Sequence, residues 1–317
     1  MFKNICKLVF IIFNLLPIYC FSEEISTENS QTNDENTPWI NAFHDTISDS
    51  VYQSAAWFDD FFIDEANTKQ NPKINARLKL EWRPRSRDWA EIKARFKVKV
   101  KLPHFKNKMD IILSDDDESE QNNLPLETTH IQPEEEKFSA SLRYMHESET
   151  GKYTDTRIGI SGGDIFIRSR HKRYINWNKN SAFKIEPSIF YFLDEGLGAR
   201  LLLEYNFQQD SHTQYRINYS IKGSESFSGI RWKHGVYKLK HLNDKTASII
   251  SLQVEGERNG ERGFIVDNYT VGYRYRFNAY KKWLFFEVEP FLEWPEVENY
   301  STTPGIAFRV EGYFYKG

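Results

Sequence analysis

Residues 92–102 read IKARFKVKVKL, and their strict alternation decides the fold. Every second residue is apolar, and the positions between are basic: Lys93, Arg95, Lys97, Lys99 and Lys101. Successive side chains of a β-strand point to opposite faces, so this strand has one apolar face and one cationic face. A soluble sandwich would bury the apolar face in a core. A membrane barrel instead turns that face toward lipid and the charged face toward a wet lumen.

The same period of two recurs along the chain from residue 73 onward. The alternating runs cover residues 74–82, 92–102, 109–113, 137–146, 153–161, 164–174, 182–192, 197–207, 212–222, 228–241, 246–257, 265–277, 283–294 and 306–315. They predict an all-β fold, a transmembrane antiparallel β-barrel of about 14 strands within residues 73–317, or of about 12 if short runs merge or lie outside the wall. Between His234 and Tyr237 the alternation slips, which predicts a β-bulge at Gly235.

Two features favour a barrel over a sandwich. Aromatic residues make up 15% of the chain and gather near the predicted strand ends, where membrane barrels carry interfacial girdles. Residues predicted to face inward also bring opposite charges together on neighbouring strands, namely Arg274, Arg276, Glu287, Glu289, Arg309 and Glu311. The last strand would pair with the first, which carries Arg77, Lys79 and Glu81, and closure would leave no unpaired edge in lipid. We therefore expect a charge network in the lumen.

Three segments precede the predicted barrel. Residues 1–22 have the pattern of a secretory signal peptide, with basic residues, then an apolar run, then Ser22 at the predicted cut. Both cysteines, Cys6 and Cys20, lie in this segment, so the mature chain would have no disulfide and no cysteine metal ligand. Residues 23–36 predict a flexible linker. Residues 37–66 carry apolar residues at helical spacing and predict a periplasmic amphipathic helix, which would pack on the rest of the protein, cap the lumen or dock on a membrane surface.

The predicted link 115–136 is long and acidic. With a periplasmic N-terminus the short links fall on the periplasmic side and this link falls outside. It holds nine acidic residues and no lysine or arginine. Three interpretations remain open: a solvated external loop, a segment folded inward onto the basic residues of 93–101 to constrict a pore, or a site for divalent cations. Arg168, Arg170 and Lys172 are also expected to face the lumen. They would either form an anion-preferring pore with the basic residues of 93–101 or be neutralised by acids such as Glu186 and Glu204 on the next strands. His171 and Arg173 would then lie near the membrane interface, within reach of lipopolysaccharide phosphates.

Composition narrows the function. The 42 Lys and Arg nearly balance 45 Asp and Glu, so no nucleic-acid partner is expected. A charged fraction of 27% is too high for a bundle of transmembrane helices. The eight histidines have no ligand spacing, and the sequence contains neither a nucleophile elbow nor a phosphate-binding loop. We therefore expect no catalytic residue, no metal and no cofactor. The expected partners are outer-membrane lipid, lipopolysaccharide and, during biogenesis, the barrel assembly machinery.

Several stretches resemble a known family. These are WFDDFF at residues 57–62, the basic strand ending in Lys101-Leu102-Pro103, and WLFFEVEP at residues 283–290 followed by Glu293-Trp294-Pro295. They resemble an uncharacterised family of proteobacterial outer-membrane β-barrel proteins over nearly the whole mature chain. The resemblance implies an outer-membrane location and a barrel, and it implies no established activity. The chain departs from the usual aromatic C-terminal assembly signal, because Tyr315 is followed by Lys316 and Gly317.

These observations favour a structural or pore-forming envelope protein that passes small solutes. One alternative is an envelope scaffold or binding protein with a plugged lumen, which would use the predicted N-terminal helix. The other is a barrel enzyme that modifies lipid, which would need a serine and a histidine at the lipid boundary, with Ser161 as the candidate nucleophile.

Overall fold

The computed structural model describes residues 74–102 except 87 and 90, then 108–115, 124–127, 138–278 except 150, then 281 and 283–316. Fourteen strands account for most of them: β1 (Ile74–Trp82), β2 (Ile92–Leu102), β3 (Met109–Ser114), β4 (Ser139–Glu149), β5 (Lys152–Ser161), β6 (Asp164–Asn178), β7 (Ser181–Phe192), β8 (Gly196–Gln208), β9 (Thr213–Ser224), β10 (Phe227–Asn243), β11 (Thr246–Asn259), β12 (Gly263–Asn278), β13 (Leu284–Pro295) and β14 (Thr303–Lys316). A 3₁₀ turn, η2 (Glu296–Glu298), joins the last two strands. The predicted signal peptide (1–22), linker (23–36) and helix (37–66) lie outside the described residues.

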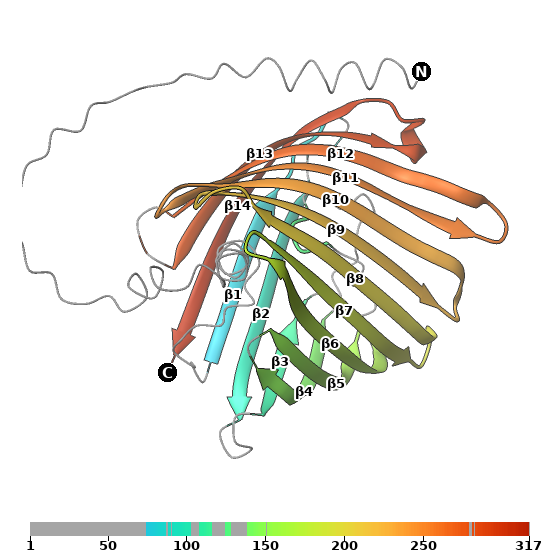
Figure 1. Ribbon diagram of the computed structural model, residues 1–317. Coiled ribbons are helices and arrows are strands. Elements are labelled where there is room, and N and C mark those ends of the chain that lie inside the picture. Colours follow the sequence, from blue (N-terminus) through green and yellow to red (C-terminus); the bar gives the residue numbers. More distant parts are fainter. Residues whose placement is uncertain are drawn as a thin grey trace, which may run out of the picture. The chain divides into compact units, whose positions relative to one another are not determined.

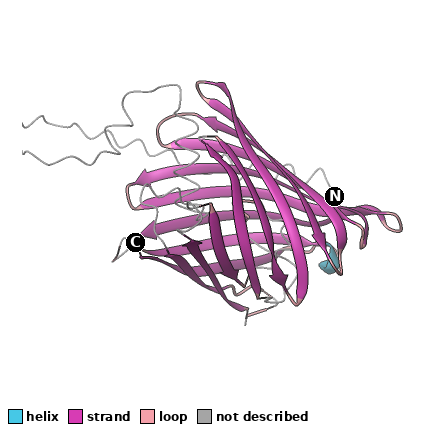
Figure 2. Ribbon diagram, turned by 90° about the horizontal axis from the view of Figure 1, so that it is seen from below, coloured by secondary structure: helices cyan, strands magenta, loops and turns pink. Residues whose placement is uncertain are grey.

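The strands form a closed antiparallel barrel, so the predicted fold and the strand count of 14 are confirmed. Each strand pairs with its neighbours in sequence, and β1 closes the ring against β14 (Figure 1). This closing register runs from Ile74 opposite Lys316 to Trp82 opposite Phe308. Figure 2 shows the same wall of strands from below. A closed sheet has no unpaired edge, which is what a lipid environment requires of β-structure.

The two faces of the wall differ in polarity as the alternation predicted. Large apolar side chains are exposed on the outside, including Ile92, Ile189 and Leu197, which are 71%, 62% and 51% exposed. The buried side chains of the inner face are mostly polar or charged. This is the inverse of a soluble barrel, and it suits a wall that stands between lipid and a polar lumen. Among the described residues, no helix is both long enough and apolar enough to cross a membrane.

Tight turns join most neighbouring strands. The β5–β6 turn is one example, in which Gly162 and Gly163 take φ values of 60° and 91°, a region that favours glycine. Ser161 therefore ends a strand beside a tight turn. Both ends of the barrel sequence, Ile74 and Lys316, lie at the same end of the wall as the turn 179–180, which the predicted topology assigns to the periplasm.

The predicted bulge at Gly235 is wrong. The register of β10 with both β9 and β11 runs unbroken from Arg231 to Lys240. The alternation slips because Tyr237 and Leu239 face inward and are 1% and 0% exposed. Lys238 and Lys240, the residues that follow each of them, face outward. Apolar side chains therefore occupy positions in the lumen wall where the pattern of a polar lumen predicts polar ones.

Gly235 makes room for the ring of Tyr237. A Cβ atom at position 235 would lie 2.6 Å from Tyr237 Cζ, which is closer than packed atoms tolerate. We expect Gly235→Ala to lower the free energy of unfolding by about 1–3 kcal/mol, the usual cost of overpacking. Urea titration of the refolded barrel, followed by tryptophan fluorescence, measures this change. Gly260→Ala is the matched control, because a Cβ there would meet nothing within 4 Å, and equal effects of the two substitutions would contradict the prediction.

Candidate functional site

The lumen wall formed by β12, β13, β14 and β1 carries a buried network of ion pairs. Arg276 Nη1 lies 2.6 Å from Glu287 Oε1, and Arg276 also pairs with Glu311. Arg309 pairs with Glu289 and reaches Glu287 Oε2 at 3.4 Å. Arg274 Nε lies 3.0 Å from Glu289 Oε2. The structure thus brings together all six residues that the sequence suggested for a charge network.

The network continues across the closing seam. Arg309 pairs with Glu81 of β1, and Arg77 of β1 pairs with Glu311 of β14. Beyond β1, Arg83 is 1% exposed and pairs with Glu293 of β13. Alternation places these side chains on the inner face, and the meander places complementary charges on adjacent strands. Such pairs fix the register of the sheet more than they stabilise it, because removing charges from water costs nearly as much as their attraction returns.

The five basic residues of β2 lie together on one face of the strand, and all five are half-buried. Lys97 pairs in register with Arg77 and Arg95 with Lys79 on β1, so basic residues face basic neighbours there. On the other side Lys101 lies opposite Asp110 of β3. Lys99 Nζ is 3.7 Å from Asp110 Oδ2, and Lys93 Nζ is 2.9 Å from Glu91 Oε1. This face of β2 is named the cationic ladder.

Basic residues extend from the ladder around the wall to β6. Among the described side chains of β2 to β6 that face inward, ten are basic: Lys93, Arg95, Lys97, Lys99, Lys101, Arg143, Arg157, Arg168, Arg170 and Lys172. Three are acidic: Asp110, Asp155 and Asp164. β4 and β11 lie seven positions apart in the ring of fourteen, as do β5 and β12, so the wall opposite is centred on β11 and β12. That wall, from β10 to β13, includes Glu255, Glu257, Glu287, Glu289 and Glu293 against Arg231, Lys233, Arg274 and Arg276. The lumen therefore has a cationic side and an opposite side on which acidic and basic residues nearly balance.

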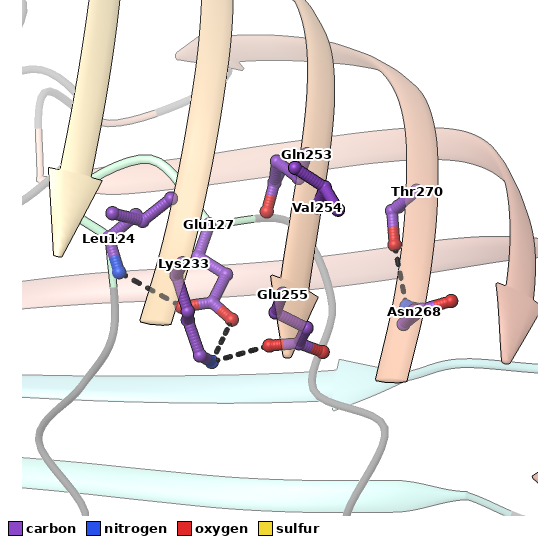
Figure 3. Close-up of a pocket in the computed structure, with 8 residues that line it drawn as sticks. All are labelled: Leu124, Glu127, Lys233, Gln253, Val254, Glu255, Asn268 and Thr270. Atoms are coloured by element: carbon purple, nitrogen blue, oxygen red, sulfur yellow. Dashed lines mark hydrogen bonds and ion pairs between the residues drawn. The ribbon is translucent and has the colours of Figure 1, made fainter. Parts of the chain in front are cut away.

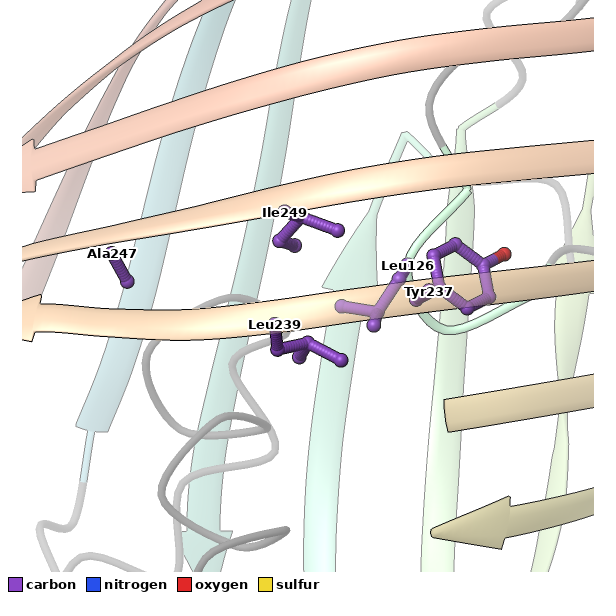
Figure 4. Close-up of a cluster of buried hydrophobic side chains, with 5 residues drawn as sticks. All are labelled: Leu126, Tyr237, Leu239, Ala247 and Ile249. Carbon is purple, nitrogen blue, oxygen red and sulfur yellow. The ribbon is translucent and has the colours of Figure 1, made fainter. Parts of the chain in front are cut away.

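A short turn from the β3–β4 link lies inside the barrel. Residues 124–127 form a tight turn, in which the Glu127 amide donates to the Leu124 carbonyl at 3.0 Å. Pro125 occupies the second position of the turn, which its fixed φ favours. Leu126 is 1% exposed and packs in a cluster with Tyr237, Leu239, Ala247 and Ile249 of β10 and β11 (Figure 4). The inward apolar residues of β10 are thus covered by this turn, which we name the lumen turn.

Charged groups hold the lumen turn in the same place. The Glu127 carboxylate pairs with Lys233 of β10, and Lys233 Nζ lies 2.8 Å from Glu255 Oε2 of β11 (Figure 3). Arg274 Nη2 donates to the Glu127 backbone carbonyl at 3.0 Å, which joins the turn to the ion-pair network. Burial raises the pKa of Glu127 to about 7, since desolvation and the neighbouring Glu255 carboxylate outweigh the attraction of Lys233. A small polar pocket adjoins the turn and includes Gln253, Asn268 and Thr270 in its lining.

The lumen turn crosses to the far wall. The link that carries it leaves β3 and returns to β4, yet its contacts are with β10, β11 and β12. β3 and β10 are seven strands apart in the ring, and so are β4 and β11. Residues 124–127 of the acidic link therefore fold inward, but onto β10 to β12, which lie opposite β3 to β5, and not onto the cationic ladder of β2. The prediction that the link folds onto the ladder does not hold for residues 124–127.

Sequence reasoning missed the seat of this turn. The sequence does contain one signal for this contact, since the apolar residues of β10 change phase at Tyr237 and Leu239. A change of phase has two explanations, however: a β-bulge or an apolar patch that faces the lumen. Nothing in the local pattern pairs Leu126 with residues more than a hundred positions away. Among the residues that the structure describes, no group of three or more His, Cys, Asp and Glu side chains could hold a metal ion.

Comparison with solved structures supports the architecture. A loop-deletion mutant of OmpT, an outer membrane protein of Vibrio cholerae, aligns with a TM-score of 0.52 at 7% identity, over 76% of this chain and 98% of that chain. The outer membrane channel DcaP of Acinetobacter baumannii gives a TM-score of 0.47 at 7% identity, over 77% and 96%. A KdgM porin gives 0.37 at 7% identity, over 76% and 99%. No family model and no curated protein matches the sequence.

The likeness to the Vibrio cholerae protein shows the fold alone, which is that of an outer-membrane β-barrel. The closed ring, the apolar outer face and the polar lumen agree with it. The protein is a barrel of the bacterial outer membrane.

Proposed function

We propose that this protein is a pore of the outer membrane that passes small solutes and prefers anions. The observation that carries the proposal is the uneven charge of the lumen, with the cationic ladder and its basic neighbours on one side and a nearly charge-balanced wall on the other. A groove lined by one sign of charge raises the local concentration of the opposite ion. An anion would therefore travel along β2 to β6, while the lumen turn covers part of the opposite wall and narrows the passage.

A second candidate is a barrel with a closed lumen that serves as a scaffold. The buried network on β12, β13, β14 and β1 favours it, since side chains such as Arg276 and Glu289, 1% and 0% exposed, fill space on that side. The two candidates differ in one measurable property, the passage of ions.

Single-channel recording separates the two candidates. The mature protein is refolded, inserted into a planar lipid bilayer and placed in a gradient of potassium chloride. The pore proposal expects stable conductance steps and a reversal potential that shows anion preference. A barrel whose refolding is verified by circular dichroism and by heat-modifiable migration, and which shows no steps, would leave the scaffold as the better account.

Charge reversal on the ladder tests which residues set the selectivity. We expect the double variant Lys97→Glu, Lys99→Glu to lower the chloride-to-potassium permeability ratio about threefold or more, because a reversed field excludes the ion it formerly attracted. The matched control is Lys238→Glu, Lys240→Glu, which makes the same charge change at the same spacing on the outer face of β10. A similar shift in both variants would show that the ladder does not line the ion path.

A further inference from the structure

The outer face of β4, β5 and β6 carries a patch of polar side chains. Its members are His146, Thr154, Thr156, Ser169 and His171. They bond to one another: His146 Nε2 lies 2.8 Å from Thr156 Oγ1, Thr154 Oγ1 lies 2.7 Å from His171 Nδ1, and Thr156 Oγ1 donates to Ser169 Oγ at 3.4 Å. We name these five residues the hydroxyl–histidine patch.

The patch reaches into the apolar band from its end nearer the turn 179–180. On β6 it falls between Ile167 and Ile175, which are 47% and 38% exposed. On β5 it lies between Lys152, which is exposed and faces Arg173 of β6, and Ile158 and Ile160, which are 54% and 51% exposed. The strands on both sides keep apolar outer faces, with Phe96 and Ile111 on β2 and β3, and Ile189, Tyr191, Leu197 and Leu203 on β7 and β8. Hydrocarbon chains would therefore cover polar groups here.

We propose that the hydroxyl–histidine patch is the contact surface for a second copy of this chain in the membrane. Hydroxyl and imidazole groups each both donate and accept hydrogen bonds, so the patch is complementary to itself. A twofold contact would bring the same residues together from both copies. Each copy would thereby remove its polar groups from acyl chains, which are poor neighbours for them.

A lipid headgroup is the competing occupant, and the position of the patch argues against it. Arg173 and Lys152, which face each other in register and are both exposed, lie at the end of the patch nearer the turn 179–180 and could meet a phosphate at the interface. Ser169 and Thr156 lie further along the strands, toward the isoleucines, where headgroups do not reach. Three of the five members are hydroxyls, which carry no charge to hold a phosphate. The surface therefore fits a protein partner better than a headgroup.

Native mass spectrometry of the full chain, extracted from membranes in a mild detergent, tests the proposal. The expected result is a population with two or more copies. The variant Thr156→Val, Ser169→Ala, His171→Leu is expected to raise the dissociation constant about tenfold or more, because each lost bond between copies weakens a contact that lipid does not replace. This variant replaces polar groups on the lipid face with apolar ones, so it retains the folding pattern. His234→Leu with Ser248→Ala, on the outer faces of β10 and β11, is the matched control and should leave the assembly unchanged.

A cross-linking experiment gives a second readout. Cys6 and Cys20 are the sequence's two cysteines, so a Ser169→Cys substitution in a chain without residues 1–22 gives a single reactive thiol. Cross-linking between copies is expected at position 169 and not with Ile221→Cys on β9. A wild-type chain that is monomeric at all concentrations, or an assembly that the patch variant leaves intact, would overturn the proposal. A monomer with bound phospholipid that Arg173→Gln releases would also overturn it and assign the surface to a headgroup.

Discussion

Replacing Arg309 by methionine is expected to lower the free energy of unfolding of the barrel by about 3–5 kcal/mol, the largest change in stability of any substitution considered. Arg309 is 3% exposed and pairs with Glu81 of β1 and with Glu287 and Glu289 of β13, the two strands on either side of β14. Without it, carboxylates remain buried with too little positive charge around them. Urea unfolding of the refolded protein in lipid vesicles, followed by the fluorescence of its tryptophans, measures the loss.

The control substitution is Arg262→Met. The Arg262 side chain is 51% exposed, and its bond to Glu296, at 3.0 Å, lies at the surface. A surface pair contributes at most about 1 kcal/mol. Adding Glu289→Gln to Arg309→Met should recover part of the lost stability, because it removes one of the uncompensated charges. If Arg309→Met cost no more than the control, the network would not be a buried ionic cluster.

The second large effect is expected from Leu126→Asp, which should release the lumen turn and raise the single-channel conductance. A carboxylate at position 126 would be buried among Tyr237, Leu239, Ala247 and Ile249 without a partner. Leaving a charged group buried and unpaired costs about 3 kcal/mol or more, which lowers the equilibrium constant between the packed and the released turn about a hundredfold. The planar-bilayer recording used for the selectivity test measures the conductance directly. This prediction rests on the proposed function as a pore.

Leu126→Met is the matched control for this substitution. It conserves volume and hydrophobicity, so the turn should stay seated and the conductance should match that of the natural chain. An unchanged conductance in Leu126→Asp, with normal ion selectivity, would show that the turn does not narrow the passage. If Leu126→Asp lost all conductance while Leu126→Met kept it, the packed turn would instead be required for the stability of the barrel wall.

Most of the fold can be predicted from the sequence, because it is built from contacts between strands that are consecutive in the chain. Each strand of the meander reveals its own faces by period two, and each pairs with the next along the chain, so the runs 74–82 to 306–315 predict both the wall and its order. Neighbouring inward charges such as Arg276 and Glu287 follow from the same pattern. Closure against β1 follows from physics, since lipid leaves no place for an open edge.

The seat of the lumen turn could not be predicted, because it depends on contacts between distant parts of the chain. Residues 124–127 have no periodicity, and a slip at Gly235 has the same appearance whether it marks a bulge or an apolar patch. The patch on β4 to β6 was missed for a different reason. Taken singly, His171 and Arg173 indicate residues at the membrane interface, whereas Thr156 and Ser169 form a polar surface only because the register places them side by side.

The seam between β1 and β14 also dictates an order of events during biogenesis. Arg77 and Glu311, which meet there, are 234 positions apart, whereas every other strand pair joins consecutive strands. Hairpins can therefore form as the chain emerges, but the ring cannot shut until its last strand has been delivered. Until then β1 presents a bare edge that could template pairing with foreign strands. That edge has to be shielded for the whole interval, and the charges on both sides of the seam then favour the correct alignment when the ends meet.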